Sequence, residues 1–251
     1  MTTTTLEGKI ALITGAGRGI GRGIAERFGS LGAHVVVNYS TSEQPALETV
    51  AAIEKMGGHA TAVQADISRV AEIDRLFQST LDRFGRPDIV VANAGIEVVD
   101  QPVLEFSEAD FDRVFGVNTR GTFFTLQRAA RQVSDGGRII YLGSSTTAYP
   151  TPGHGLYGGS KIAPQFLVEV LAKEIGHRGV TVNSILPTAT LGAGVSTESL
   201  RPAAQEYIRT YIPLGRAATL DDVANAAEYL ASTLGSFVSG QHLLLSGGGP
   251  A

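Results

Sequence analysis

The chain passes from its first apolar run into its first helical pattern through the stretch Thr14-Gly15-Ala16-Gly17-Arg18-Gly19-Ile20-Gly21. The glycines at 15, 19 and 21 permit a tight turn and leave the backbone bare of side chains. The helix that follows presents free N–H groups at its N-terminus, and such groups attract anions. The general G-x-G-x-x-G spacing is not met in register, but the position directly after an apolar run predicts phosphate binding here.

Short apolar runs, most of them rich in β-branched residues, alternate with helical patterns along the whole chain. The runs are Ile10–Ile13, Val35–Val37, Ala60–Val63 (the weakest), Ile89–Val91, Arg138–Leu142, Val180–Ile185 and His242–Leu245. None alternates cleanly between apolar and polar residues, which is typical of strands buried on both faces of a parallel sheet. The helical patterns cover 19–30, 43–56, 69–84, 118–133, 156–176 and 220–233. This order predicts an α/β fold: a single doubly wound Rossmann-type domain over 1–251, with seven parallel strands and helices on both faces.

One irregular stretch, about 187–218, is rich in Thr, Gly, Ala and Pro and contains a short helical pattern near 197–211. It is either a surface excursion or a lid over a site. Long loops in compact domains are often functional, so we favour the lid.

Composition excludes several classes of function. The chain has no cysteine, which rules out disulfides, thiol catalysis and Cys-ligated metal, and we expect no metal site. The net charge is −4 and the Lys and Arg residues are scattered, so the sequence shows no basic block that would bind nucleic acid. The first residues, Met1–Lys9, show no signal peptide, and no apolar stretch approaches the roughly 20 residues that span a bilayer. We therefore expect a cytoplasmic protein without a membrane or nucleic-acid partner.

From about Gly8 to Gly248 the chain resembles the short-chain dehydrogenase/reductase family. Its T-G-x-x-x-G-x-G turn, Asp66 in Ala65-Asp66-Ile67, and the Asn93-Ala94-Gly95 segment match that family in order and spacing. Nearby patterns resemble β-ketoacyl-carrier reductases and polyhydroxynaphthalene-type ketone reductases. Taken alone, Asp66 could equally cap a helix and Asn93 could belong to an ordinary turn. The resemblance implies a nicotinamide cofactor held by Gly15, Gly17, Arg18, Gly19, Ile20, Gly21, Asn38, Tyr39, Ser40, Ser42, Asp66, Ile67, Asn93, Ala94, Gly95, Tyr157, Lys161, Pro187, Thr188 and Thr190.

The segment Tyr157-Gly-Gly-Ser-Lys161 carries the chemistry. Residues four apart share one face of a helix, so the Lys161 ammonium can lie near the Tyr157 phenol and lower its pKa for proton exchange. The resemblance implies that Ser144 binds the substrate oxygen, with Ser145 as a near-equal candidate. It also implies that Asn118 kinks its helix and serves a proton relay through Lys161, although an N-cap role would look the same.

The chain departs from the family pattern after the sixth strand. Thr188 replaces the usual glycine, and Gly192 replaces a downstream threonine, which weakens the assignment of contacts at 187–190. Pro164 lies inside the predicted helix 156–176, where it removes one backbone donor and is expected to bend the helix beyond the active site.

The second strand indicates which cofactor is used. It ends Val37-Asn38-Tyr39-Ser40-Thr41-Ser42, with no acidic residue before Glu43 to hold both ribose hydroxyls of NAD(H). The hydroxyls and Arg18 could instead bind a 2′-phosphate, so we expect NADP(H). The alternative is that Asn38 alone holds the ribose and Arg18 is a solvated turn residue.

The expected function is hydride transfer between NADP(H) and a ketone or secondary alcohol, most simply as a carbonyl reductase. The alternatives are an NAD-dependent secondary alcohol dehydrogenase and a non-catalytic cofactor-sensing protein. Site-facing candidates, Ile96-Glu97-Val98, 149–154 and 189–211, are mostly small or apolar and favour a moderately apolar carbonyl compound. Helix 156–176 is apolar around most of its circumference, and the helix from Asn118 is similar, so we expect a homotetramer.

Overall fold

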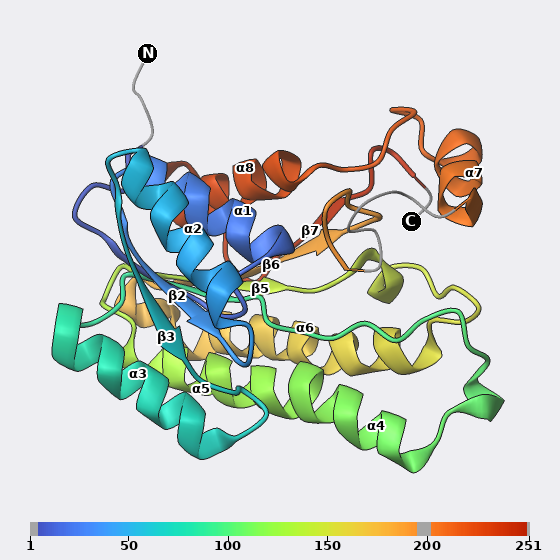
Figure 1. Ribbon diagram of the computed structural model, residues 1–251, viewed down its shortest axis with the longest axis horizontal. Coiled ribbons are helices and arrows are strands. Elements are labelled where there is room, and N and C mark those ends of the chain that lie inside the picture. Colours follow the sequence, from blue (N-terminus) through green and yellow to red (C-terminus); the bar gives the residue numbers. More distant parts are fainter. Residues whose placement is uncertain (1–4, 195–201, 250–251) are drawn as a thin grey trace.

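Seven parallel strands pair in the order β3-β2-β1-β4-β5-β6-β7 in the computed structural model of the chain, which describes residues 5–194 and 202–249 (Figure 1). The strands are β1 (Ile10–Ile13), β2 (His34–Tyr39), β3 (His59–Gln64), β4 (Ile89–Ala92), β5 (Arg138–Leu142), β6 (Thr181–Pro187) and β7 (His242–Leu245). The predicted fold class and all seven predicted strands are confirmed.

The α-helices are α1 (Gly19–Ser30), α2 (Glu43–Lys55), α3 (Val70–Phe84), α4 (Glu108–Phe115), α5 (Thr122–Gln132), α6 (Gly155–Ile175), α7 (Pro202–Tyr211) and α8 (Leu220–Ala231). A π-helical segment, Gly116–Gly121, joins α4 to α5. Short 3-10 turns are η1 (Val103–Glu105), η3 (Ser145–Thr147), η4 (Gly176–Arg178) and η5 (Thr233–Gly235).

Helices cover both faces of the sheet, with α1, α2 and α8 on one side and α3, α5 and α6 on the other (Figure 1). Each side has its own apolar core, and successive strand residues contribute to opposite cores. Ala11 and Ile13 pack into the first core while Leu12 packs into the second, all three fully buried. Burial on both faces explains why the strands read as uninterrupted apolar runs.

The strand order reverses between β1 and β4, since the chain proceeds from β1 outward to β3 before returning to β4. Connections that leave in opposite directions open a crevice at the carboxyl ends of these two strands, where ligands bind in open α/β sheets. Thr14 and Asn93 follow β1 and β4 at this edge. No helix within the described ranges is both long and apolar enough to cross a membrane.

The predicted helix over residues 118–133 was wrong in its start, because it leaves out the first part of the helical region. Helix α4 begins ten residues earlier, at Glu108, with a capping box in which Ser107 and Asp110 exchange hydrogen bonds. Asn118 therefore lies inside the π-helical segment and is not an N-cap. The helix expected near 197–211 is present from Pro202 to Tyr211, while residues 197–201 lie outside the described part of the chain.

Candidate active site

The glycine-rich turn is packed tightly against the segment that follows β4. Gly15 has φ of +64°, and a Cβ built on it would lie 2.9 Å from Ala94 Cα. A Cβ on Gly21 would lie 2.5 Å from Asn93 Nδ2. Gly15 is therefore required both for conformation and for space, and Gly21 for space.

The Asn93 side chain holds this turn in place. Its Nδ2 donates to the carbonyl oxygens of Thr14 and Gly15 at 2.9 and 3.1 Å, while the Asn93 and Ala94 N–H groups donate to Thr14 Oγ1. The segment Asn93-Ala94-Gly95 therefore acts first as a scaffold for the turn.

The N-terminus of α1 is open to an anion. Its N-cap, Arg18, makes no side-chain capping hydrogen bond, so no side chain of the cap occupies the N–H groups of the first turn, which starts at Gly19. Ile20 in this turn lines the adjoining cavity. Free helix N-terminal amides beside bare glycine backbone fit the diphosphate of a dinucleotide.

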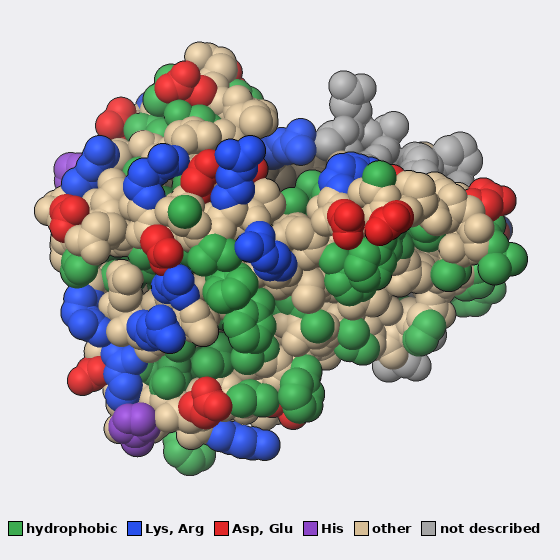
Figure 2. Space-filling view, turned by 90° about the horizontal axis from the view of Figure 1, so that it is seen from below, with side chains coloured by type: hydrophobic (Ala, Val, Ile, Leu, Met, Phe, Trp, Pro, Cys, Tyr) green, Lys and Arg blue, Asp and Glu red, His purple; other side chains and the backbone are tan. Residues whose placement is uncertain are grey.

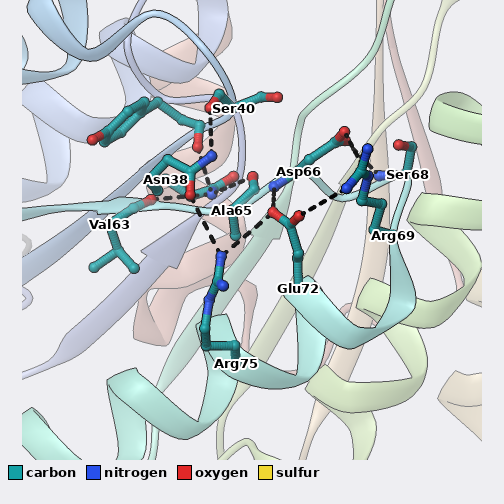
Figure 3. A network of polar contacts seen from close by, with 11 residues as sticks. Asn38, Ser40, Val63, Ala65, Asp66, Ser68, Arg69, Glu72 and Arg75 are labelled. Carbon is teal, nitrogen blue, oxygen red and sulfur yellow. Dashed lines mark hydrogen bonds and ion pairs between the residues drawn. The ribbon is translucent and has the colours of Figure 1, made fainter.

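Asn38, expected at the ribose, is turned into the protein. It is 1% exposed, and its Nδ2 donates to the carbonyls of Val63 and Ala65 (Figure 3). Its Oδ1 accepts from Gly15 N–H at 3.2 Å. The side chain thus ties the glycine-rich turn to the end of β3 and is already hydrogen-bonded within the protein through both its nitrogen and its oxygen. The alternative in which Asn38 alone holds the ribose is not supported by this geometry.

The residues after Asn38 do face solvent. Ser40, Ser42 and Arg18 are exposed, and Gln64 at the end of β3 donates to the Ser40 carbonyl at 2.8 Å. Tyr39 donates its hydroxyl to the Glu43 carboxylate at 3.2 Å, a contact that the sequence analysis missed. The turn lies beside this segment because Ala16 N–H donates to the Asn38 carbonyl.

Asp66 shapes the loop that follows β3. Its Oδ1 accepts from Ser68 N–H at 2.9 Å, and its own N–H donates to Glu72 Oε2 at 2.7 Å (Figure 3). The N-cap of α3 is Arg69, so the N-cap alternative for Asp66 is wrong. Ile67 is 5% exposed and its side chain packs into the second core, so the side chain is not presented to a cofactor.

Tyr157, Ser144 and Lys161 converge as expected from the sequence. The Tyr157 phenol and the Ser144 hydroxyl line the same cavity and influence each other, and Ser144 Oγ accepts from Thr146 Oγ1 at 2.9 Å. Lys161 Nζ lies 5.8 Å from the centre of the Tyr157 ring and donates to the Leu142 carbonyl at 3.0 Å. Ser144 rather than Ser145 contacts the tyrosine, although both line the same cavity.

Burial dominates the protonation of this pair. It raises the pKa of Tyr157 well above its ordinary value, with a smaller contribution from the Glu97 carboxylate, and the neighbouring Ser144 hydroxyl opposes the rise in pKa. Burial also lowers the pKa of Lys161 to about 8, against the opposing charge of Glu97. The lowered tyrosine pKa expected from the sequence is therefore wrong for the protein by itself, because desolvation outweighs the nearby cation.

Asn118 is fully buried and uses its whole amide. Its Oδ1 accepts from Ile96 N–H at 2.8 Å; its Nδ2 donates to the Ile96 carbonyl at 2.8 Å and to Ser160 Oγ at 2.9 Å. Ser160 Oγ in turn donates to the Tyr157 carbonyl at 2.7 Å. The residue thus joins the segment after β4 to the helix that carries Tyr157 and Lys161.

Pro164 lies inside the continuous helix α6, where it leaves the Ser160 carbonyl without its usual N–H donor. That carbonyl instead accepts from Thr119 Oγ1 at 2.8 Å. The missing donor is therefore replaced by a hydroxyl from the π-helical segment, next to Asn118.

The end of β6 forms one wall of the site. Pro187, Thr188 and Thr190 line the cavity, and Thr190 Oγ1 donates to the Thr188 carbonyl at 2.8 Å. Asp100 is the one described non-glycine residue with positive φ, so the backbone at Thr188 does not need glycine. This explains how threonine is accepted at that position.

A cavity of about 470 Å³ opens in front of Tyr157 and Ser144. Its remaining wall includes Glu97, Val99, Tyr149, Pro152, Ala189 and Ala193. Of the site-facing candidates from the sequence, Glu97 and parts of 149–154 and 189–194 lie on this wall. The described residues contain no group of three His, Asp or Glu side chains that could hold a metal ion.

Comparison with known proteins agrees with this geometry. The family described as Enoyl-(Acyl carrier protein) reductase matches residues 15–249. A hydroxynaphthalene reductase-like protein of Metarhizium brunneum is 42% identical over 264 residues, covering 98% of this chain and 97% of that protein. The chain belongs to the short-chain dehydrogenase/reductase family.

Solved structures support the same assignment for this short-chain dehydrogenase/reductase. A dehydrogenase/reductase from Sinorhizobium meliloti superposes with a TM-score of 0.93 at 37% identity, covering 98% of this chain and 97% of that one. The angucycline C-6 ketoreductase LanV with bound NADP superposes with a TM-score of 0.90 at 35% identity, covering 98% and 96%. The protein is therefore an oxidoreductase of this family.

Because Lys161 is buried, we expect the protein to become more stable when this side chain is replaced by an uncharged one. Because the folded protein lowers its pKa to about 8, replacing it in Lys161→Met should raise the free energy of unfolding at pH 7 by about 3 kcal/mol. Between pH 8 and the unfolded pKa of about 10.4, the unfolded chain keeps a proton that the folded chain has lost, so wild-type stability rises with pH and the gain should shrink. Urea denaturation of the cofactor-free proteins across this range measures the difference.

The exposed Lys173 on the same helix provides the matched control, and Lys173→Met should change stability by less than about 0.5 kcal/mol. A Lys161→Met variant that is less stable than the wild type at pH 7 would contradict the argument.

Proposed function

We propose that this short-chain dehydrogenase/reductase reduces ketones to secondary alcohols with NADPH. The observation that carries the proposal is that Ser144 and Tyr157 lie on one wall of a largely apolar cavity, with buried Lys161 5.8 Å from the tyrosine ring. Two hydroxyls on one wall of a cavity suit a carbonyl oxygen. The names of the hydroxynaphthalene reductase-like relative and of the LanV ketoreductase support the same reaction class.

The protonation of Tyr157 favours the direction of reduction. With its pKa raised by burial, the phenol keeps its proton at neutral pH and can donate it to a carbonyl oxygen. Ser144 donates a second hydrogen bond to that oxygen and so favours the growing negative charge. A bound reduced nicotinamide supplies the hydride that the carbonyl carbon receives.

Lys161 and Asn118 support Tyr157, the first through its charge and the second by holding the helix in position. The ammonium of Lys161 stabilises the phenolate that remains after proton donation. Asn118, through Ser160, fixes the turn of α6 on which the tyrosine stands. Both side chains are buried, so neither needs to reorganise during the reaction.

Tyr157→Phe should lower kcat at least about 100-fold, because the ring still fits while the transferable proton is gone. The dissociation constant for NADP⁺, measured by fluorescence titration, should change by less than about threefold. Tyr229→Phe on α8, which is 39% exposed, is the matched control and should retain wild-type turnover. Near-normal turnover by Tyr157→Phe would contradict the assignment.

NADP(H) is the proposed cofactor because the chain after Asn38 offers exposed hydroxyls and no acidic residue before Glu43. Arg18 stands at the exposed N-cap of α1 beside this segment and can pair with a 2′-phosphate. The NADP in the LanV structure is consistent with this choice.

Arg18→Ala should lower kcat/KM for NADPH at least about tenfold and alter the value for NADH by less than about threefold. The two cofactors are compared on one ketone by nicotinamide absorbance. Arg22→Ala, a change on the same helix where the arginine pairs with Glu26 at 2.7 Å, should preserve the NADPH preference. A wild-type preference for NADH would overturn this part of the proposal.

We also propose a homotetramer. Exposed apolar side chains gather on the face formed by α4, α5 and α6: Phe111, Phe123, Ile162 and Phe166, the last 68% exposed (Figure 2). A second apolar surface, Leu234 and Phe237, lies at η5. A tetramer with dihedral symmetry needs two separate interfaces, and two separate exposed apolar surfaces are available for them.

Light scattering at micromolar concentration should give a tetramer for the wild type. Phe166→Glu should yield a smaller species, because a charge on the α5 and α6 face would be buried unpaired between protomers. A monomeric wild type would contradict the proposal.

A further inference from the structure

The Ser144 hydroxyl is held by the residue two positions further along the chain. Ser144 is the N-cap of the short 3-10 turn η3, and its Oγ accepts from Thr146 N–H at 3.3 Å. The same oxygen accepts from Thr146 Oγ1 at 2.9 Å. Thr146 therefore contacts Ser144 Oγ through both its backbone and its side chain.

These two contacts determine what the Ser144 hydroxyl can still do. A serine hydroxyl has one proton to donate and two lone pairs that accept. Both lone pairs of Ser144 Oγ are used by Thr146, so the hydroxyl can add a further contact only as a donor. A substrate carbonyl oxygen requires a donor, because that oxygen can only accept.

Thr146 itself lies beside the reacting groups. It lines the cavity together with Ser144 and Tyr157. A Cβ built on Gly158, the residue after Tyr157, would lie 3.5 Å from the Thr146 carbonyl oxygen and 3.6 Å from Thr146 Oγ1. Thr146 thus packs against the bare backbone of α6, next to the tyrosine.

The effect of Ser144 on Tyr157 agrees with a hydroxyl that donates. The neighbouring Ser144 hydroxyl opposes the rise in the pKa of Tyr157. A donor near the phenol oxygen favours the phenolate, whereas an acceptor favours the neutral phenol. This is the effect expected of a Ser144 proton that points away from Thr146 and toward Tyr157.

We propose that Thr146 is a positioning residue, which occupies both lone pairs of Ser144 Oγ and so turns the Ser144 proton toward the substrate carbonyl oxygen. The inference rests on the proposed ketone reduction and deepens it, since Thr146 acts on the substrate only through Ser144. Without the Thr146 hydroxyl, Ser144 Oγ has one free lone pair, so the Ser144 hydroxyl can rotate and accept instead of donate. The hydrogen bond that stabilises the growing negative charge is then weakened.

Thr146→Val keeps the backbone N–H and nearly the same shape but removes the hydroxyl. Its kcat for a ketone should fall at least about tenfold, while KM and the NADP⁺ dissociation constant should change by less than about threefold. Thr146→Ser, which restores a hydroxyl, should recover kcat to within about threefold of the wild type. A Thr146→Val variant with wild-type kcat would overturn the proposal.

A double-mutant cycle tests whether Thr146 acts through Ser144. In a Ser144→Ala background, Thr146→Val should lower kcat by a further factor of less than about two, because the hydroxyl that it positions is already gone. A loss of about tenfold in both backgrounds would assign Thr146 a structural role and overturn the proposal.

The matched control is Thr147→Val, the same change one residue further along η3. The Thr147 hydroxyl donates to the Ser144 backbone carbonyl at 2.7 Å, and this carbonyl also accepts from Thr147 N–H at 3.1 Å. The change therefore leaves the Ser144 side chain and one bond to its carbonyl in place, and kcat should stay within about threefold of the wild type. An equal loss of kcat in Thr146→Val and Thr147→Val would assign the effect to the turn as a whole and overturn the proposal.

Infrared spectroscopy separates this inference from the proposed function, because it needs no turnover. A hydrogen-bond donor lowers the stretching frequency of a carbonyl group. An isotope-labelled ketone bound together with NADP⁺ should therefore absorb at a lower frequency in the wild type than in Thr146→Val. If the bound ketone shows this difference but is not reduced, ketone reduction fails and the role of Thr146 stands. If ketones are reduced and the two carbonyl frequencies are equal, only the role of Thr146 fails.

Discussion

The fully buried side-chain amide of Asn118 is the interaction on which the rest of the site depends. After β4 ends, the chain leaves the sheet, and the backbone groups of Ile96 need new partners because an unpaired buried peptide group is costly. The Asn118 side chain accepts from the Ile96 N–H and donates to the Ile96 carbonyl, as the backbone of a neighbouring strand would. Its remaining N–H reaches Ser160, so one side chain sets the distance between the cofactor edge of the sheet and the helix that carries Tyr157 and Lys161.

This placement requires an irregular helix. The π-helical segment Gly116–Gly121 turns Asn118 inward between α4 and α5 without ending the helix. Single π turns within α-helices are rare and concentrate at functional sites. The irregularity is stabilised here by a fully satisfied amide and by the Thr119 hydroxyl.

The sequence predicted the sheet well because each strand is buried on both faces and therefore reads as an apolar run. It predicted only the second part of the α4 to α5 helix. Signals for the first part were present, since Ser107 and Asp110 form a capping box, but the extra residue of the π turn shifts the apolar period and Gly116 interrupts it. The apolar pattern of a single regular helix therefore indicates a start at residue 118 and does not reveal the turns of α4 before it.

The site was predictable where local spacing decides geometry and unpredictable where distant partners do. Tyr157 and Lys161 share a helix face, so their four-residue spacing was sufficient. Asn38 faces inward because β2 pairs with β3, whose end presents the Val63 and Ala65 carbonyls to it. The rise in the pKa of Tyr157 likewise depends on burial by the whole fold, which no spacing reveals.

Pro164 and Thr119 form a coupled pair although they are far apart in the sequence. Pro164 has no N–H to donate to the Ser160 carbonyl of α6, and the Thr119 hydroxyl donates to that carbonyl instead. A residue with an N–H at position 164 would compete for that carbonyl and release the hydroxyl, so the effects of substitutions at these two positions should not add. In evolutionary terms a proline at 164 is expected to occur together with a hydroxyl-bearing residue at 119, because the proline alone leaves the Ser160 carbonyl without a donor.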